Sequence, residues 1–299
     1  MSVVINTNVD STRIQNLLTN STNKLSESMQ RMSSGLKINN AKDDAAGTVI
    51  SARMKVQLNG NEIAQKNVQN ANALLSTVEG NVDVIADNVS RIRDLTLQAK
   101  NGTYSAEEIQ AMDDEVQQRI AEINRVHASA KYSSLNLFTD TAGLQTNGAK
   151  FQVGADAGEN NTITADKSIF QSVQFSAVSG LSNFSLKDLS NSAGTLNPTG
   201  VTKEDNDTDF DIAVRALDNA IDNLSDRKSQ IGSAGNRLDS ALSTLTTQYE
   251  NLASSNSLIT DADIAAEASK FTQNQILQQI STSLLAQANS APSIAMSLV

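Results

Sequence analysis

The chain has 299 residues, a formal net charge of −10 and a pI near 4.6, which argues against nucleic-acid binding, because that function needs clustered Lys and Arg. It contains no Cys, which excludes disulfides and thiolate metal ligands, and no Trp, so a large globular core would lack its usual bulky side chains. The apolar runs are too short for a transmembrane helix or a Sec signal peptide, so we expect a cytoplasmic protein or one exported without a cleaved signal.

The first amphipathic segment begins near residue 14 and has helical spacing of its apolar residues. These residues are Ile14, Leu17, Leu25, Met29, Met32 and Leu36. Gly35 is placed to end this helix, because glycine adopts the left-handed conformation without strain. Asp43 or Asp44 is then expected to cap a second helix, since a carboxylate accepts hydrogen bonds from the free N–H groups of a first turn.

Two later segments carry heptad patterns, and no proline occurs before Pro198 to interrupt the first of them. The first seam consists of Val68, Ala71, Leu75, Val78, Val82, Ile85, Val89 and Ile92. The second runs from Phe210 to Leu252 through Leu238, Leu242 and Leu245, interrupted at Lys228 and Gly235. This spacing predicts coiled-coil or bundle packing, and a helix over residues 44–99 would be about 80 Å long.

Between these segments the sequence predicts a further helix and a β-hairpin. Ser105 and Glu108 form a capping box at the start of an amphipathic run that continues to Ile123. Alternating residues at 151–153 and 162–164 flank turn-forming residues 157–161, which predicts the hairpin.

The predicted fold class is mainly α, a long helical rod with a small β-hairpin region and paired terminal helices. Three regions are expected: a terminal helical domain of residues 1–44 plus 257–299, a rod domain of residues 45–179 plus 207–256, and a short exposed connection over residues 180–206.

Enzyme chemistry has little support in the sequence. The single histidine, His127, has no second histidine to share a metal, and no HExxH, GxGxxG, P-loop or GxSxG motif is present. The Asp113-Asp114 pair and the pair Asp261 and Asp263 are better read as first-turn acids of helices, with Thr260 as the N-cap before the second pair. We therefore expect no enzyme activity and no cofactor.

The C-terminal 29 residues, from Phe271 to Val299, contain no charged side chain. The broad apolar face of this segment consists of Ile264, Phe271, Ile276, Leu277, Ile280, Leu284, Leu285 and Ala288. Buried charges must be paired, whereas amides and hydroxyls can pair across an interface, so a helix without charges on any side indicates neighbours on all sides. The segment at the N-terminus is the first such neighbour, and other subunits can supply the rest. A low-charge, partly disordered tail is the alternative.

Four stretches resemble the bacterial flagellins. RMSSGLKINNAKDDAAG at residues 31–47 resembles their N-terminal signature, and VINTNV near the N-terminus, SRIRDLTLQAKNGTYS and QILQQISTSLLAQANSAPSIAMSL also match, in the family's order. The resemblance covers roughly residues 1–175 and 207–299.

The resemblance implies a subunit that self-assembles into the extracellular flagellar filament after export by the flagellar type III apparatus. It further implies that the chain ends pair in an inner tube, that the usual mid-chain outer domains are replaced by a short connection, and that junction, cap and export chaperone proteins are partners. The implied inner-tube residues are Phe271, Ile276, Leu277, Ile280, Leu284, Leu285, Leu17, Leu25, Met32 and Leu36.

The resemblance also implies recognition by the animal flagellin-sensing Toll-like receptor, through residues that match Arg91, Leu95 and Glu115. Leu95 has an alternative role in the core, since it lies three residues after the seam residue Ile92. The motif departs from the common pattern at Ser90 and Asp94, which would reduce affinity.

Three competing interpretations remain: a hook–filament junction protein of the same family, a flagellin with an inserted metallopeptidase, and a free-standing coiled-coil scaffold. One His without HExxH argues against the second, and the scaffold leaves the uncharged tail unexplained.

Overall fold

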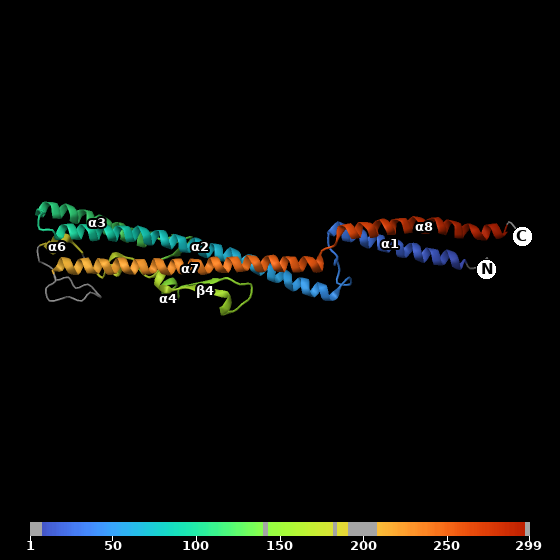
Figure 1. Cartoon of the computed structure of the whole chain (residues 1–299), viewed down its shortest axis with the longest axis horizontal. Helices are drawn as coiled ribbons and strands as arrows, with labels where there is room; N and C mark the ends of the chain where they lie inside the picture. Colours follow the sequence, from blue (N-terminus) through green and yellow to red (C-terminus); the bar gives the residue numbers. More distant parts are fainter. Residues whose placement is uncertain (1–7, 140–142, 182–183, 191–207, 297–299) are drawn as a thin grey trace. The chain divides into compact units, whose positions relative to one another are not determined.

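The computed structural model describes residues 8–139, 143–181, 184–190 and 208–296. It is mainly helical, as the sequence predicts, and has two small antiparallel strand pairs, of which the sequence predicted one (Figure 1). The chain forms two compact units: residues 1–59 with 249–299, here the terminal unit, and residues 60–248, here the rod unit. The two longest helices, α2 (Ala45–Lys100) and α7 (Asp209–Thr260), each contribute to both units.

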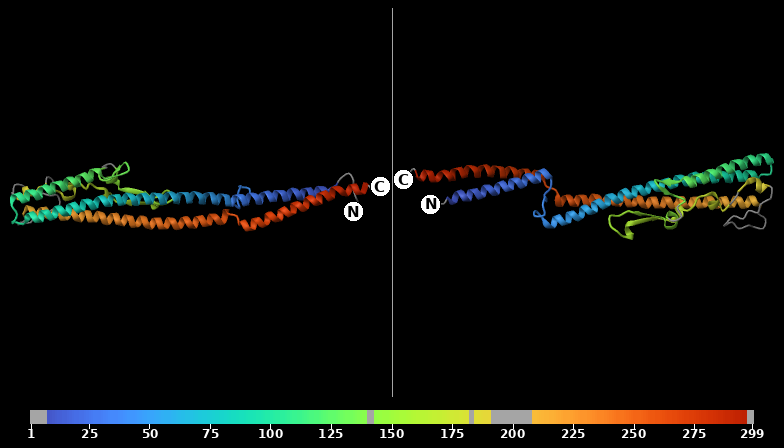
Figure 2. Two further views of the ribbon diagram at one scale, coloured as in Figure 1. Left: turned by 90° about the horizontal axis from the view of Figure 1, so that it is seen from above. Right: turned by 180° about the vertical axis from the view of Figure 1, so that it is seen from behind.

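The terminal unit contains a pair of helices from opposite ends of the chain. Helix α1 (Val9–Ser34) lies beside α8 (Ile264–Met296), and the views in Figures 1 and 2 agree on this pairing. Gly35 ends α1 at φ 72°, and its N–H donates to the Arg31 carbonyl at 2.9 Å. The predicted left-handed stop is therefore confirmed.

Short polar contacts fix the other ends of the terminal-unit helices. Asp44 accepts from the Gly47 N–H at 2.9 Å and so begins α2, whereas Asp43 accepts from the N–H groups of Asn39 and Asn40 and closes the preceding loop. At α8 the expected Thr260 cap is wrong. Asp263 accepts from two N–H groups, at 2.9 and 3.1 Å, because its short carboxylate reaches the first turn of a helix that begins at residue 264.

A β-bridge joins the two chain segments at this point. Leu36 pairs with Asp261 in antiparallel fashion, the Lys37 N–H donates to the Thr260 carbonyl at 2.7 Å, and the Ala262 N–H donates to the Gly35 carbonyl at 2.9 Å. These backbone bonds hold the end of α1 against the start of α8, so the two helices leave the bridge as neighbours.

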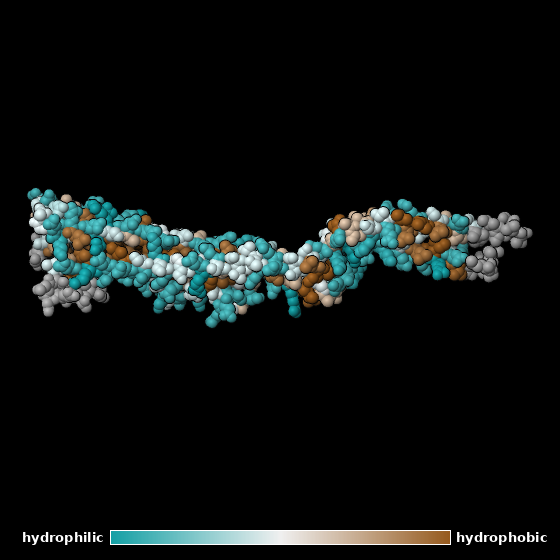
Figure 3. Space-filling view, viewed as in Figure 1, coloured by the Kyte–Doolittle hydropathy of each residue, from teal (hydrophilic) through white to brown (hydrophobic). Residues whose placement is uncertain are grey.

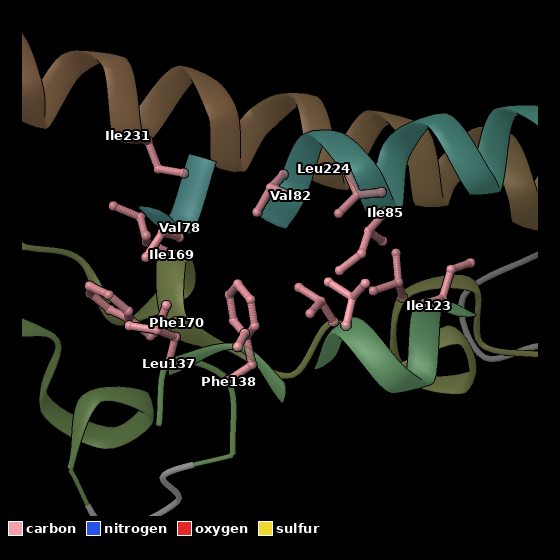
Figure 4. Packing of buried hydrophobic residues seen from close by; sticks show 14 of the residues in the cluster. Val78, Val82, Ile85, Ile123, Leu137, Phe138, Ile169, Phe170, Leu224 and Ile231 are labelled. Carbon is pink, nitrogen blue, oxygen red and sulfur yellow. The ribbon is translucent and has the colours of Figure 1, made fainter. Parts of the chain in front are cut away.

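The core of the rod unit is built on the heptad seams of α2 and α7 and on helix α3 (Ala106–Ser129). Figure 4 shows Val82 and Ile85 of α2 near Leu224 of α7, with Ile123 of α3 below them in the view. The predicted capping box at the start of α3 is confirmed, since the Ser105 side chain accepts from Glu108 N–H and the Glu108 carboxylate accepts from Ser105 N–H.

Polar pairs on the surface keep α2 and α7 in one antiparallel register. Each step forward along α2 is matched by an equal step backward along α7. The pairs are Asn72 with Asp239, Asp83 with Lys228, Arg93 with Asp218, and Lys100 with Asp211. Lys228, an apparent interruption of the heptads, is thus one of the pairs that align the helices.

Small elements cover this helical core. After α3 come β1 (Lys131–Tyr132), β2 (Leu135–Asn136) and α4 (Leu144–Asn147). The predicted hairpin is confirmed as β3 (Ala149–Gln152) paired with β4 (Thr162–Ala165), and η1 (Glu159–Asn161) lies in its loop. The 3₁₀ turn η2 (Lys167–Phe170) and the short helix α5 (Phe175–Ser179) follow, and their phenylalanines are buried.

The segment expected to begin an exposed connection is packed against α3 instead. Leu181, Phe184 and the short helix α6 (Leu186–Ser190) contribute buried side chains. The buried Asp113 of α3 accepts from the Leu186 N–H at 2.7 Å and the Ser185 hydroxyl at 3.1 Å, so it caps α6 and is not a first-turn acid of its own helix. Residues 191–207 of the expected connection lie outside the described residues.

Candidate assembly interface

The contact between α1 and α8 is close and partly polar. The least exposed positions of both helices alternate at spacings of three and four, as in a coiled coil, and here form the α1–α8 seam. The seam residues are Ser11, Ile14, Leu18, Ser21, Leu25, Ser28 and Met32 of α1, and Glu267, Phe271, Asn274, Gln278, Ser281, Leu285 and Ala288 of α8. Serine and alanine let the backbones approach, and many Cα atoms of the two helices lie within 8 Å.

Polar side chains tie the two helices together along the seam. Asn8 donates to the Ala288 carbonyl at 2.8 Å, the Ser11 hydroxyl is 2.7 Å from Asn289 Oδ1, and Gln278 donates to Thr22 at 3.2 Å. These amides and hydroxyls thus pair across the seam alongside its apolar side chains.

Four apolar side chains are exposed in the uncharged part of α8, which begins at Phe271. Ile276, Leu277, Ile280 and Leu284, here the outer stripe, are between 42% and 50% exposed. Residues 276, 280 and 284 are each four apart and so share one side of the helix. Leu17 and Met29 of α1 are also exposed, and Figure 3 shows apolar side chains gathered on the visible face of this helix pair.

The structure thus divides the implied inner-tube residues into two groups. Phe271, Leu285, Leu25 and Met32 are half-buried in the α1–α8 seam, and Leu36 is half-buried beside the bridge to Asp261. The outer stripe and Leu17 have no such cover. The broad apolar face therefore has one side against α1 and another that is open in the single chain.

One charged side chain is buried in the seam, at its end near the β-bridge. Glu267 is 5% exposed, and it accepts from the Ser28 hydroxyl and from Lys270 at 3.2 Å. Burial favours the neutral carboxyl, but these hydrogen bonds and the nearby Arg31 outweigh it and hold the pKa of Glu267 below its ordinary value. Beyond Lys270 the helix has no charge left to pair.

In the rod unit, the three residues matched to receptor contacts do not share one surface. Arg91 of α2 pairs with Glu115 of α3 at 3.0 Å, and both are partly exposed. Leu95 is 2% exposed in the core, so it has no surface to offer a partner in this conformation. The reason is its place one helical turn after the seam residue Ile92, on the side of α2 that faces the core.

Two residues that extend the Arg91–Glu115 pair, Arg119 and Asn88, were not predicted from the sequence. Arg119 donates to Glu115 at 3.0 Å and to Asn88 at 3.2 Å, so Glu115 lies between two guanidinium groups. Arg91, and then Arg119, hold the pKa of Glu115 below its ordinary value against the opposing effect of burial. The spacing of four residues between Glu115 and Arg119 is a signal that could have found this pair.

The residues named for the rod seam lie in the core of the rod unit. Leu75, Val78, Val82, Ile85, Val89, Ile92, Leu238 and Leu245 are buried, and Leu242 is partly buried against them. His127 stacks on Phe138, with ring centroids 6.5 Å apart, and burial lowers its pKa. Among the described residues, no group of His, Asp and Glu could hold a metal ion, and none of the described helices is long and apolar enough to span a membrane.

Comparison with known proteins gives the family. A model described as the bacterial flagellin N-terminal helical region matches residues 5–142, and one described as the C-terminal helical region matches residues 214–299. A flagellin from Bacillus subtilis (strain 168) is 32% identical over 305 residues, covering 96% of this chain and 97% of that protein. The flagellar filament 30.7 kDa core protein of Treponema maltophilum is 30% identical, with 96% of each chain covered.

A solved structure shares the fold. A Vibrio parahaemolyticus protein assigned as flagellar hook-associated has a TM-score of 0.52 at 14% identity and covers 73% of this chain and 99% of its own. The two family matches leave only residues 143–213 between them, so a large middle region is absent. This chain belongs to the bacterial flagellin family, a family of structural proteins.

Proposed function

We propose that this protein is the repeating subunit of a flagellar filament used for swimming, and that α1 and α8 join subunits together in its inner tube. In that filament, residues 1–44 with 257–299 form the inner tube and residues 45–179 with 207–256 form the surrounding rods. Export through the flagellar type III apparatus would deliver the chain to the growing tip, with chaperone, junction and cap proteins as partners.

The open side of α8 is the observation that supports this proposal most strongly. The outer stripe leaves four large side chains half exposed on a helix without a charged residue after Lys270. Covering them fully would stabilise each subunit in the polymer by about 3–6 kcal/mol, since complete burial of one such side chain is worth about 1.5–3 kcal/mol. No charge on this part of α8 has to be desolvated in the process.

Leu284→Asp tests the proposal, because it places an unpaired carboxylate in the outer stripe while leaving the rod unit untouched. We expect the variant to keep its helical circular dichroism and to fail to elongate filament seeds under negative-stain electron microscopy. Leu284→Met, which keeps an apolar side chain of similar volume, is the matched control and should elongate seeds. Normal elongation by Leu284→Asp would refute the role of the outer stripe.

The same assay with the parent protein separates the competing functions. A filament subunit extends seeds into long tubes, whereas a hook–filament junction protein would add a ring and stop. Rings without tubes would therefore replace the proposed function with the junction role.

We also propose that the unassembled subunit is recognised by the animal flagellin-sensing Toll-like receptor. Arg91 and Glu115 support this proposal because they form a partly exposed pair across α2 and α3, and arginine is frequent at interface hot spots. Leu95 would act indirectly, by holding α2 against the core under Arg91.

A further inference from the structure

Met29 is an exposed methionine at the edge of the α1–α8 seam. It lies between the half-buried seam residues Leu25 and Met32, and it is 53% exposed. Of the other methionines whose side chains are described, Met32, Met54 and Met112 are all partly buried. Among these four, Met29 is therefore the most exposed residue and the one that a small solute reaches most easily.

We propose that Met29 is a redox-sensitive modification site, and that its oxidation by hydrogen peroxide keeps the subunit from joining the filament. This inference rests on the proposed function. In the reaction, a sulfur lone pair attacks one peroxide oxygen, an S–O bond forms and the O–O bond breaks. The departing hydroxide takes up the proton of the new S–OH group and leaves as water, so the sulfur loses two electrons and the peroxide gains them.

The position of Met29 explains why this change matters for assembly. Its apolar side chain flanks the α1–α8 seam, as that of Leu17 does nearer the start of α1. A neighbouring subunit that covers the helix pair would bury Met29. A sulfoxide is polar and chiral and must be desolvated in that contact, so it weakens packing between subunits. It leaves the rod unit unaffected, because Met29 belongs to the terminal unit.

The exposure of Met29 to peroxide therefore depends on whether the subunit has assembled. In the single chain the sulfur is open to peroxide, whereas in the polymer the adjoining subunit shields it. Oxidation therefore acts on subunits that have not yet assembled, and it is reversible by enzymes of the methionine sulfoxide reductase class.

Peptide mass spectrometry after a hydrogen peroxide titration tests the accessibility. We expect Met29 to oxidise in monomers on the order of tenfold faster than in filaments, because burial lowers access to the thioether. Equal rates in the two states would overturn the inference. Met112, which packs against the core of the rod unit, is the internal reference and should oxidise at similar rates in both states.

Seeded elongation tests the consequence. Peroxide-treated parent protein should lose elongation and regain it after treatment with a methionine sulfoxide reductase, while Met29→Leu should elongate equally well with and without peroxide. Met112→Leu, in the rod unit, is the matched control and should stay as sensitive as the parent. Equal sensitivity of Met29→Leu and parent would refute the inference alone, whereas untreated parent that never elongates seeds would refute the proposed function and this inference with it.

Discussion

Two leucines one turn apart on α7 allow a sharp test of the heptad packing in the rod unit. Leu238 is fully buried, whereas Leu242 is only partly buried at the edge of the same core. Both occupy seam positions in the sequence pattern, so the pattern alone predicts equal costs for Leu238→Ala and Leu242→Ala. The structure predicts unequal ones.

The magnitude follows from the atoms removed. Leu→Ala deletes three carbon atoms, which is worth about 2.4 kcal/mol of lost transfer free energy at about 0.8 kcal/mol for each buried group. At Leu238 a cavity adds to this loss, so we expect about 3–5 kcal/mol. At Leu242 part of the side chain already contacts water and the site can relax, so we expect about 1–2 kcal/mol.

Urea unfolding followed by circular dichroism measures both values, and the chain's many helical residues give a strong signal. The unfolding midpoint should fall much farther for Leu238→Ala than for Leu242→Ala, with an unchanged dependence of the free energy on urea concentration. Equal shifts for the two variants would refute the difference in burial, and no shift for either would refute the packing of α7 in this core.

Two further predictions concern polar groups of the rod unit. Arg91→Ala should weaken binding to the receptor ectodomain by more than about 1 kcal/mol in a titration, because Arg91 is a partly exposed hot-spot candidate. The thermal stability of the monomer should not fall by a similar amount. Unchanged affinity would exclude the proposed contact. Burial lowers the pKa of His127, so the folded state favours the neutral ring and its contribution to stability is present above about pH 6.5, the unfolded pKa. As the pH falls below that value, the unfolded state takes up the proton first and the folded state loses stability. Between pH 7.5 and pH 5.5 the urea midpoint should therefore fall by more in the parent than in His127→Gln. Equal decreases in the two proteins would show that His127 is not responsible.

The helices and their ends could be read largely from the sequence, because these depend on local interactions. Gly35 stops α1, Ser105 and Glu108 cap α3, and the alternating residues around 157–161 form the hairpin. The caps act within about four residues, and the hairpin pairs two strands that follow one another in the chain, so residues close in sequence suffice to define each feature. The heptads of α2 and of the middle of α7 likewise predicted the buried side, whereas Tyr249 near the end of the predicted α7 seam is 38% exposed.

Which side chain faces which neighbour depended on the tertiary structure. The tail sequence shows one broad apolar face, but only the position of α1 divides it into a seam around Phe271 and Leu285 and an outer stripe around Ile280 and Leu284. Asp113 was expected to be a first-turn acid of its own helix, whereas it is buried and caps α6. Contacts of this kind join residues far apart in the chain, so no local pattern records them, and they appear only when packing brings the segments together.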